Sequence, residues 1–172
     1  QSEKYFESVK DILLKEFSIK EVLNKYNQDL VSRINNANSV SLHIRRGDYV
    51  ENKETRTFHG TCSLEYYKEA INYLKNKSAG TSLYIFSDDV AWAKANLRVD
   101  VPAHFVDMDN HGYVDMHLMS LCKHNIIANS SFSWWGAYLN KNPGKVVIAP
   151  KWWFADKTIN TNDLIPASWI KM

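Results

Sequence analysis

Two adjacent arginines followed by a glycine and an aspartate are the residues in this sequence best suited to chemistry. Arg45, Arg46, Gly47 and Asp48 directly follow residues 39–44, in which apolar and polar side chains alternate. Alternation with a period of two is typical of a β-strand. Arginine presents a rigid fork of N–H donors that suits phosphate, and each charge-assisted hydrogen bond contributes about 1.5–3 kcal/mol. The stretch therefore predicts an anion-binding turn at the end of a strand.

The same residues allow a simpler interpretation, in which the turn lies on the surface and Asp48 forms an ion pair with one of the arginines. In either case Gly47 lets the backbone turn sharply, and Asp48 can orient an arginine or a sugar hydroxyl. The spacing alone does not decide between the two interpretations.

Length and composition limit the class of protein. With 172 residues, 45% of them hydrophobic, the chain suits a single globular domain with a sizeable core. The net charge of +2 gives no electrostatic reason to expect nucleic-acid binding. Cys62 and Cys122 lack the spacing of a disulfide framework or a metal site, which favours a reducing compartment. We see no apolar run of about 18 residues, so we expect no transmembrane helix.

The hydrophobic pattern predicts five strands separated by helices. The strands are expected at residues 39–44, 83–86, 103–106, 126–128 and 146–149. Helices are expected at residues 3–16, at 18–34 behind a Ser18–Glu21 capping box, after Ser63, after Asp88, at 113–122 and after Ser130 or Ser131. Residues 51–61 show no periodicity and are predicted to form a loop. This alternation predicts an α/β fold, a Rossmann-like doubly wound parallel sheet of about five strands, with residues 1–36 as a leading helical segment of the single domain 1–172.

The carboxyl ends of four predicted strands carry polar residues, and in a parallel sheet such ends meet where ligands bind. The first end contributes His43, Arg45, Arg46 and Asp48; the second Ser87, Asp88 and Asp89; the third Asp107, Asp109, Asn110 and His111; the fourth Asn129, Ser130 and Ser131. Backbone amides at the helix start after the fourth strand, with two hydroxyls beside them, form a ready phosphate site. A pair of arginines across from that site would clamp a diphosphate.

Each of these residues has a structural alternative. Asp88 and Ser131 can serve as helix N-caps, and Asp115 can interact with the dipole of its helix. His117 and His124 fit packing or capping better than ligand binding. No Gly-x-Gly-x-x-Gly motif or Walker loop occurs, and no Cys, His or Asp spacing indicates a metal site. What remains is a nucleoside-diphosphate site held by arginines.

Longer motifs resemble a known family. His43-x-Arg45-Arg46-x-Asp48 resembles the first motif of the superfamily of α1,2-, α1,6- and protein O-fucosyltransferases. Residues 115–140, which contain Asn-Ser-Ser-Phe-Ser-Trp-Trp-Gly, are similar to the α1,2-fucosyltransferase branch, glycosyltransferase family 11. Residues 1–6 and 151–155 are similar to the same branch, so the resemblance spans essentially the whole chain.

The resemblance implies an inverting transfer of L-fucose from GDP-β-L-fucose to the 2-hydroxyl of a galactoside, with no metal and no other cofactor. It places Arg45 at the diphosphate with Arg46 completing the motif, His43 and Asp115 at the guanine, and Ser131 with its neighbour Ser130 at a phosphate. Arginine charge would stabilise the departing GDP, which then needs no proton donor. The family further implies a cytoplasmic bacterial protein, with peripheral association with the inner membrane as an open alternative.

One departure from the family concerns its N-terminal half, which opens with a Gly-Gly-Leu-Gly-Asn-Gln-Met-Phe-type motif and helps to build the acceptor side. Nothing here matches that motif, and the chain begins with Gln1. We therefore interpret the chain as the donor-binding C-terminal half of a glycosyltransferase of the B type. Its partners would be the donor, a galactoside acceptor and the missing N-terminal half, without which we expect no transfer. Asp48 is a candidate catalytic base; a base in the missing half, or none, stays open.

Two alternatives remain at this stage. A carbohydrate-binding module could stack sugars on Trp152, Trp153 and Trp169, although such modules are usually all-β. Within the enzyme class, an α1,6 or protein O-linked fucosyltransferase also fits the arginine motif, because the residues that select the acceptor are missing.

Overall fold

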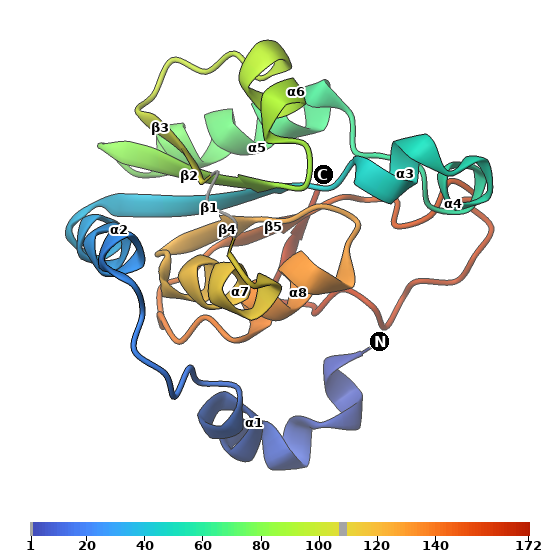
Figure 1. Ribbon diagram of the computed structural model, residues 1–172. Coiled ribbons are helices and arrows are strands. Elements are labelled where there is room, and N and C mark those ends of the chain that lie inside the picture. The colour runs from blue at the N-terminus through green and yellow to red at the C-terminus, as the bar shows by residue number, and fades with distance from the viewer. Residues whose placement is uncertain (1, 107–109) are drawn as a thin grey trace.

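The computed structural model of the protein describes residues 2–106 and 110–172 and contains a parallel β-sheet with helices on both faces (Figure 1). The strands are β1 (Asn38–Ile44), β2 (Thr81–Ser87), β3 (Ala103–Val106), β4 (His124–Ile126), β5 (Val147–Ala149) and β6 (Ile170–Lys171). The six-stranded sheet has the order β3-β2-β1-β4-β5-β6, and each neighbouring pair is parallel. The predicted α/β fold with a doubly wound parallel sheet is confirmed, and β6 is a short addition at one edge.

Helices cover the two faces of the sheet in separate layers (Figure 1). One face is covered by α5 (Leu64–Lys77) and α6 (Val90–Asn96), and the other by α2 (Lys25–Asn36), α7 (Gly112–Leu121) and α8 (Ser131–Tyr138). The predicted cap of α5 is confirmed, since Oγ of Ser63 accepts a hydrogen bond from the N–H of Tyr66 at 3.1 Å. In the part of the chain that is described, no helix combines the length and apolar character needed to cross a bilayer.

β1 is the centre of the sheet, and both of its faces are buried. Val40, Leu42 and Ile44 pack in the core beneath α5, as the alternation predicted. The two serines of the other face are buried with partners: Oγ of Ser39 accepts the N–H of Lys123 at 3.1 Å, and Oγ of Ser41 accepts a hydrogen bond from Nδ2 of Asn125 at 2.7 Å. Burial on both faces is usual for a strand inside a parallel sheet, and it fixes the direction in which β1 delivers the residues that follow it.

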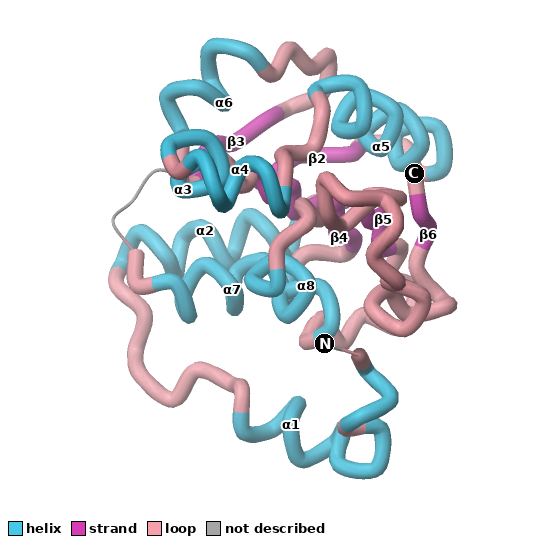
Figure 2. The backbone as a smooth tube through the Cα atoms, turned by 90° about the vertical axis from the view of Figure 1, so that its right-hand side faces the viewer, coloured by secondary structure: helices cyan, strands magenta, loops and turns pink. Residues whose placement is uncertain are grey.

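The strand order reverses between β1 and β4. The chain continues from β1 to β2 and β3 on one side, and it returns to the other side for β4, β5 and β6. In open α/β sheets ligands bind outside the carboxyl ends of the strands at such a switch point. The short helices α3 (Gly47–Glu51) and α4 (Lys53–His59) lie beyond this end of the sheet (Figures 1 and 2).

The leading segment differs from the predicted pair of helices. Residues 3–16 form two 3₁₀ turns, η1 (Glu3–Tyr5) and η2 (Glu7–Val9), followed by the short helix α1 (Lys10–Glu16). The helix predicted to begin after Ser18 begins at Lys25, because Oδ1 of Asn24 caps it by accepting the N–H of Asn27 at 2.8 Å. The hydroxyl of Ser18 instead donates to the carbonyl of Lys15 at 2.6 Å.

Two further predictions about local structure are wrong. Residues 51–61 are not a plain loop, because α4 occupies most of them, capped by Oδ1 of Asn52, which accepts the N–H groups of Glu54 and Thr55. Most side chains of α4 are exposed, so it has no apolar stripe for the sequence to display. The predicted strand 126–128 is shifted, since β4 ends at Ile126.

Candidate functional site

Arg45 directly follows β1 and lies between two carboxylates. Its Nη2 is 2.8 Å from Oδ1 of Asp48, and its Nη1 is 3.3 Å from Oδ2 of Asp88. The centre of its guanidinium lies 5.4 Å from the ring centre of Tyr49, within cation–π range. The ion pair with Asp48 that the sequence allowed is therefore present. A guanidinium has more N–H donors than these two ion pairs use, so Arg45 can still donate to a ligand.

Asp88 fixes the turn that presents Arg45. Its Oδ1 accepts a hydrogen bond from the backbone N–H of Arg46 at 2.8 Å, while its Oδ2 pairs with Arg45. A Cβ atom on Gly47 would lie only 2.7 Å from that Oδ2. Any side chain at this position would therefore displace the Asp88 carboxylate, which comes from the end of the neighbouring strand β2.

Arg46 turns in another direction, towards α6. The centre of its guanidinium lies 3.6 Å from the ring centre of Trp92, and its Nε lies 3.4 Å from Oδ2 of Asp89. Asp89 is also the N-cap of α6, so the prediction that Asp88 begins this helix is wrong. Both neighbours of the Arg46 guanidinium therefore come from the chain that follows β2. The two guanidiniums thus have different neighbours: Arg45 lies between Asp48 and Asp88, and Arg46 lies against Trp92 and Asp89.

The start of α8 lies beside the turn after β1. The hydroxyl of Tyr49 donates a hydrogen bond to the carbonyl of Asn129 at 3.3 Å, which joins that turn to the residue before the α8 N-cap. Ser130 is the N-cap and is buried, yet it makes no side-chain capping bond, and the exposed Ser131 is the first helical residue. The first N–H groups of a helix lack intrahelical partners. These N–H groups and the two hydroxyls lie at the helix start for which the sequence predicted phosphate binding.

His43 is buried near the end of β1. Its ring centre lies 5.4 Å from that of Phe132, in the first turn of α8. Its Nδ1 is buried and has no hydrogen-bond partner among the described residues. Burial, together with the charge of Arg45, lowers the pKa of His43 to about 3, so the ring is neutral at physiological pH. A neutral imidazole has one donor and one acceptor nitrogen, which suits contact with a nucleobase edge.

Asp115 lies half-buried in the first turn of α7. Its Oδ1 accepts a hydrogen bond from Nδ2 of Asn110 at 2.8 Å, and Asn110 also accepts one from Asn27 of α2 at 2.9 Å. Burial raises the pKa of Asp115, and the bond from Asn110 opposes that shift. No hydrogen bond or ion pair of the described residues joins Asp115 to His43 or to Arg45. Asp115 is therefore positioned by the α2–α7 layer, separately from the turn after β1.

The contacts of two aromatic residues in this region, Phe132 and Tyr49, were not predicted. Phe132 touches His43 and also lies against the start of α7, where a Cβ on Gly112 would be 3.4 Å from its ring. Tyr49 joins Arg45 to Asn129, as described above. Neither Tyr49 nor Phe132 belongs to a periodic pattern that would predict these contacts. Of the residues involved, the sequence pointed to Asn129, because it follows a predicted strand.

The remaining candidates have structural roles or lie outside the described residues. Burial raises the pKa of the Cys62 thiol to about 11 and raises that of Cys122, so neither is a thiolate nucleophile at physiological pH. Nδ1 of His124 accepts the N–H of Val146 at 3.0 Å. Asp107 and Asp109 lie outside the described residues. Within residues 2–106 and 110–172, no three His, Cys, Asp or Glu side chains gather in a way that could hold a metal ion.

An open parallel sheet with its switch point between β1 and β4 defines a Rossmann-like α/β protein, a class in which ligands generally bind at the switch point. The model of one family, "Glycosyl transferase family 11", matches residues 1–172. The chain belongs to glycosyl transferase family 11.

Relatives agree with this assignment. The chain is 41% identical to the O-antigen biosynthesis glycosyltransferase WbnK of Escherichia coli over 173 residues, which cover 96% of this chain and 56% of that protein. It is 40% identical to the alpha-1,2-colitosyltransferase of Escherichia coli, over 100% of this chain and 60% of that protein. It is 23% identical to galactoside alpha-(1,2)-fucosyltransferase 1 of Leontocebus fuscicollis, over 78% of this chain and 40% of that protein. The chain thus spans little more than half the length of its bacterial relatives.

Proposed function

We propose that this chain is the donor-binding part of an inverting α1,2-fucosyltransferase, which moves L-fucose from GDP-β-L-fucose to the 2-hydroxyl of a galactoside. The observation that carries the proposal is the position of Arg45 and of the α8 start, which follow the two strands that flank the switch point of a family 11 chain. The names of two relatives, an alpha-1,2-colitosyltransferase and a galactoside alpha-(1,2)-fucosyltransferase, support the α1,2 linkage.

In this proposal Arg45 binds the diphosphate and stabilises the charge that develops on GDP as the bond to the sugar breaks. The amides at the start of α8, with Ser130 and Ser131, bind further phosphate oxygens. The ionic cluster around the turn contains one more carboxylate than guanidiniums. Binding therefore depends on directed hydrogen bonds from Arg45 and not on a general positive potential. Asp48 and Asp88 orient the guanidinium.

His43 and Asp115 have the guanine-reading roles in this proposal. The neutral ring of His43 and the carboxylate of Asp115 supply acceptors, and guanine presents N1–H and N2–H₂ donors that adenine lacks as a pair. Arg46, stacked on Trp92, holds the turn against α6 and does not contact the donor. Independence from metal ions remains an expectation that a chelator can test.

Calorimetric titration with GDP tests the donor site. Arg45→Ala should weaken GDP binding by about 2–4 kcal/mol, because phosphate oxygens then remain unpaired in a partly desolvated cleft. Arg45→Lys should recover only part of this loss, because an ammonium group does not present the guanidinium fork. Arg98→Ala, at an exposed arginine after α6, is the matched control and should bind GDP as the unmodified chain does. Equal GDP affinity in the Arg45→Ala and Arg98→Ala variants would refute the assignment.

A second donor is favoured by one observation, the 40% identity to an alpha-1,2-colitosyltransferase over the whole chain. Colitose lacks one hydroxyl of fucose, so GDP-colitose and GDP-fucose share the portion that Arg45 and α8 would bind. Competition between the two GDP-sugars for the chain distinguishes them: a preference for GDP-colitose would replace fucose by colitose and leave the GDP site unchanged. The proposal also includes a galactoside as acceptor, an N-terminal half as partner and a cytoplasmic location.

A further inference from the structure

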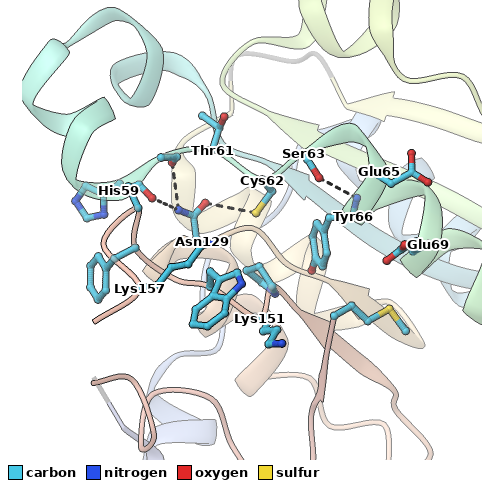
Figure 3. A pocket seen from close by; sticks show the side chains of 16 residues that line it. His59, Thr61, Cys62, Ser63, Glu65, Tyr66, Glu69, Asn129, Lys151 and Lys157 are labelled. Atoms are coloured by element: carbon cyan, nitrogen blue, oxygen red, sulfur yellow. Dashed lines mark hydrogen bonds between the residues drawn. The ribbon is translucent and has the colours of Figure 1, made fainter. Parts of the chain in front are cut away.

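A pocket of about 480 Å³ lies beside the carboxyl end of β5, on the α5 side of the sheet (Figure 3). This volume is within the range of small-molecule sites. Its lining comes from residues 59–63, from the start of α5, from Asn129 and from residues 150–157 with Met172. None of the residues proposed above to bind the donor lines it. The donor proposal therefore leaves this pocket without a role.

Trp152 provides an aromatic surface in this pocket. Its side chain is 47% exposed, whereas Trp153 and Trp169 are buried, so the three-tryptophan surface of the lectin-like alternative does not form. Nζ of Lys151 and Nζ of Lys157 lie 5.3 and 5.2 Å from the Trp152 ring centre. The C–H face of a pyranose packs well on an indole, because its weakly positive hydrogens meet the negative face of the ring.

The charged residues of the pocket are balanced. Glu65 and Glu69 come from neighbouring turns of α5, and Lys151 and Lys157 come from the chain after β5 (Figure 3). In the described part of the chain no ion pair joins these glutamates to these lysines, and Glu65 pairs only with Lys68, at 4.0 Å. The pocket therefore offers acceptors from α5 and donors from the other segment, and the charges of these four side chains cancel. A neutral polyol suits this arrangement, because each hydroxyl both donates and accepts.

Asn129 and two stacked rings connect the pocket with the turn that holds Arg45. Nδ2 of Asn129 donates to the carbonyls of His59 and Trp153 at 2.9 and 3.1 Å, which ties together the segments on either side of the pocket. The ring of His59 stacks on that of Tyr49 with 4.7 Å between centres, and Tyr49 in turn contacts Arg45. A ligand in the pocket is thus separated from Arg45 by two side chains, a short span for an oligosaccharide.

The pocket contains no activated nucleophile. Cys62, which lines it, donates through Sγ to Oδ1 of Asn129 at 3.5 Å, and it is buried as a thiol. Its groups are those of a binding site and not of a second catalytic centre.

We propose that this pocket binds the acceptor as a neutral oligosaccharide, with one sugar ring packed on Trp152 and hydroxyls bonded to Glu69 and Lys151. The inference rests on the proposed function in naming the ligand as the acceptor, a galactoside. It adds a place for that acceptor on the donor-binding chain itself.

Lactose is the neutral galactoside probe, with binding followed by saturation-transfer NMR and by tryptophan fluorescence. Trp152→Ala should weaken lactose binding at least tenfold, and Glu69→Gln should weaken it several-fold while preserving shape. Tyr73→Ala is the matched control, because Tyr73 is an exposed aromatic residue on α5 with a lysine 5.9 Å from its ring, outside the pocket. This variant should bind lactose as the unmodified chain does. 3′-Sialyllactose, which adds a carboxylate, should bind more weakly than lactose.

GDP titrations on the same proteins separate this inference from the donor proposal. Loss of lactose binding in Trp152→Ala, with GDP binding unchanged, supports the acceptor pocket. Lactose that fails to bind the unmodified chain, or binds Trp152→Ala equally well, overturns it while GDP binding still supports the donor site. If lactose binding depends on Trp152 but the chain has no affinity for GDP, the saccharide pocket is supported and the proposed donor function is overturned.

Discussion

Replacing Gly47 by alanine tests whether Asp88 holds the turn that presents Arg45. The added methyl group would lie 2.7 Å from Oδ2 and 3.3 Å from Cγ of Asp88. The carboxylate must then rotate away and give up its hydrogen bond from the N–H of Arg46 and its ion pair with Arg45. A hydrogen bond to a charged group contributes about 1.5–3 kcal/mol, and the partly exposed ion pair adds little.

Alanine also has a compensating advantage, because Gly47 is the first residue of α3 and a Gly→Ala exchange in a helix gains up to about 1 kcal/mol. We therefore expect Gly47→Ala to lower the free energy of unfolding by about 1–2 kcal/mol. In an Asp88→Ala background the methyl meets no carboxylate, so the same exchange should be neutral or slightly stabilising.

Urea unfolding of the four proteins of this cycle, followed by circular dichroism, measures the coupling between the two positions. A coupling of about 1–3 kcal/mol is expected from the hydrogen bond that Gly47→Ala disrupts. If Gly47→Ala costs the same in both backgrounds, then Asp88 is not what requires a glycine at this position, and the reasoning about the turn is refuted.

Three further predictions concern the site residues. The pKa of His43 falls from 6.5 to about 3 on folding, so its contribution to stability is complete above pH 6.5 and is lost as the pH falls towards 3. Between pH 7 and 5 this lowers the free energy of unfolding by about 2 kcal/mol. In His43→Gln, urea unfolding curves should no longer show this part of the pH dependence. The same pH dependence in the variant and in the unmodified chain would contradict the burial of a neutral ring. GDP should bind at least about tenfold more tightly than ADP, and Asp115→Asn should remove most of this preference. If the unmodified chain binds GDP and ADP with equal affinity, His43 and Asp115 do not recognise the guanine base. The chain alone should fold and bind GDP-fucose yet form no 2′-fucosyllactose from lactose by mass spectrometry. In the proposed function an N-terminal half supplies one wall of the cleft, and the orientation that the complete cleft imposes contributes about 7–11 kcal/mol. Turnover of about 1 per second would show that this chain suffices.

The sequence predicted the elements whose residues face the core with a clear period. β1 alternates strictly and was placed within a residue of its observed bounds, and α5 combines an apolar stripe with the Ser63 cap, so its start was placed correctly. The residue types at the strand ends also predicted that His43, Arg45 and Ser131 lie at one edge of the sheet, because parallel strands bring their carboxyl ends together.

Elements that depend on competing local hydrogen bonds were not predictable in this way. Ser18 has the residue types of a capping box, but its hydroxyl bonds backwards to α1, and Asn24 caps α2 in its place. β6 has only two residues and shows no period. The direction of Arg46 depends on Trp92, a residue 46 positions away in sequence that was assigned only to a helix stripe. Long-range contacts of this kind decide the direction of each arginine side chain, and no local pattern encodes them.

The location of the GDP site is the central claim, and amide chemical-shift mapping tests it most directly. Spectra of the ¹⁵N-labelled chain, recorded as GDP is added, report each backbone N–H separately. We predict the largest shifts at residues 45–49 and 130–133, where the turn after β1 meets the start of α8, with small changes at residues 151–157, which line the pocket proposed for the acceptor. Largest shifts at residues 151–157, with residues 45–49 and 130–133 unaffected, would contradict the account.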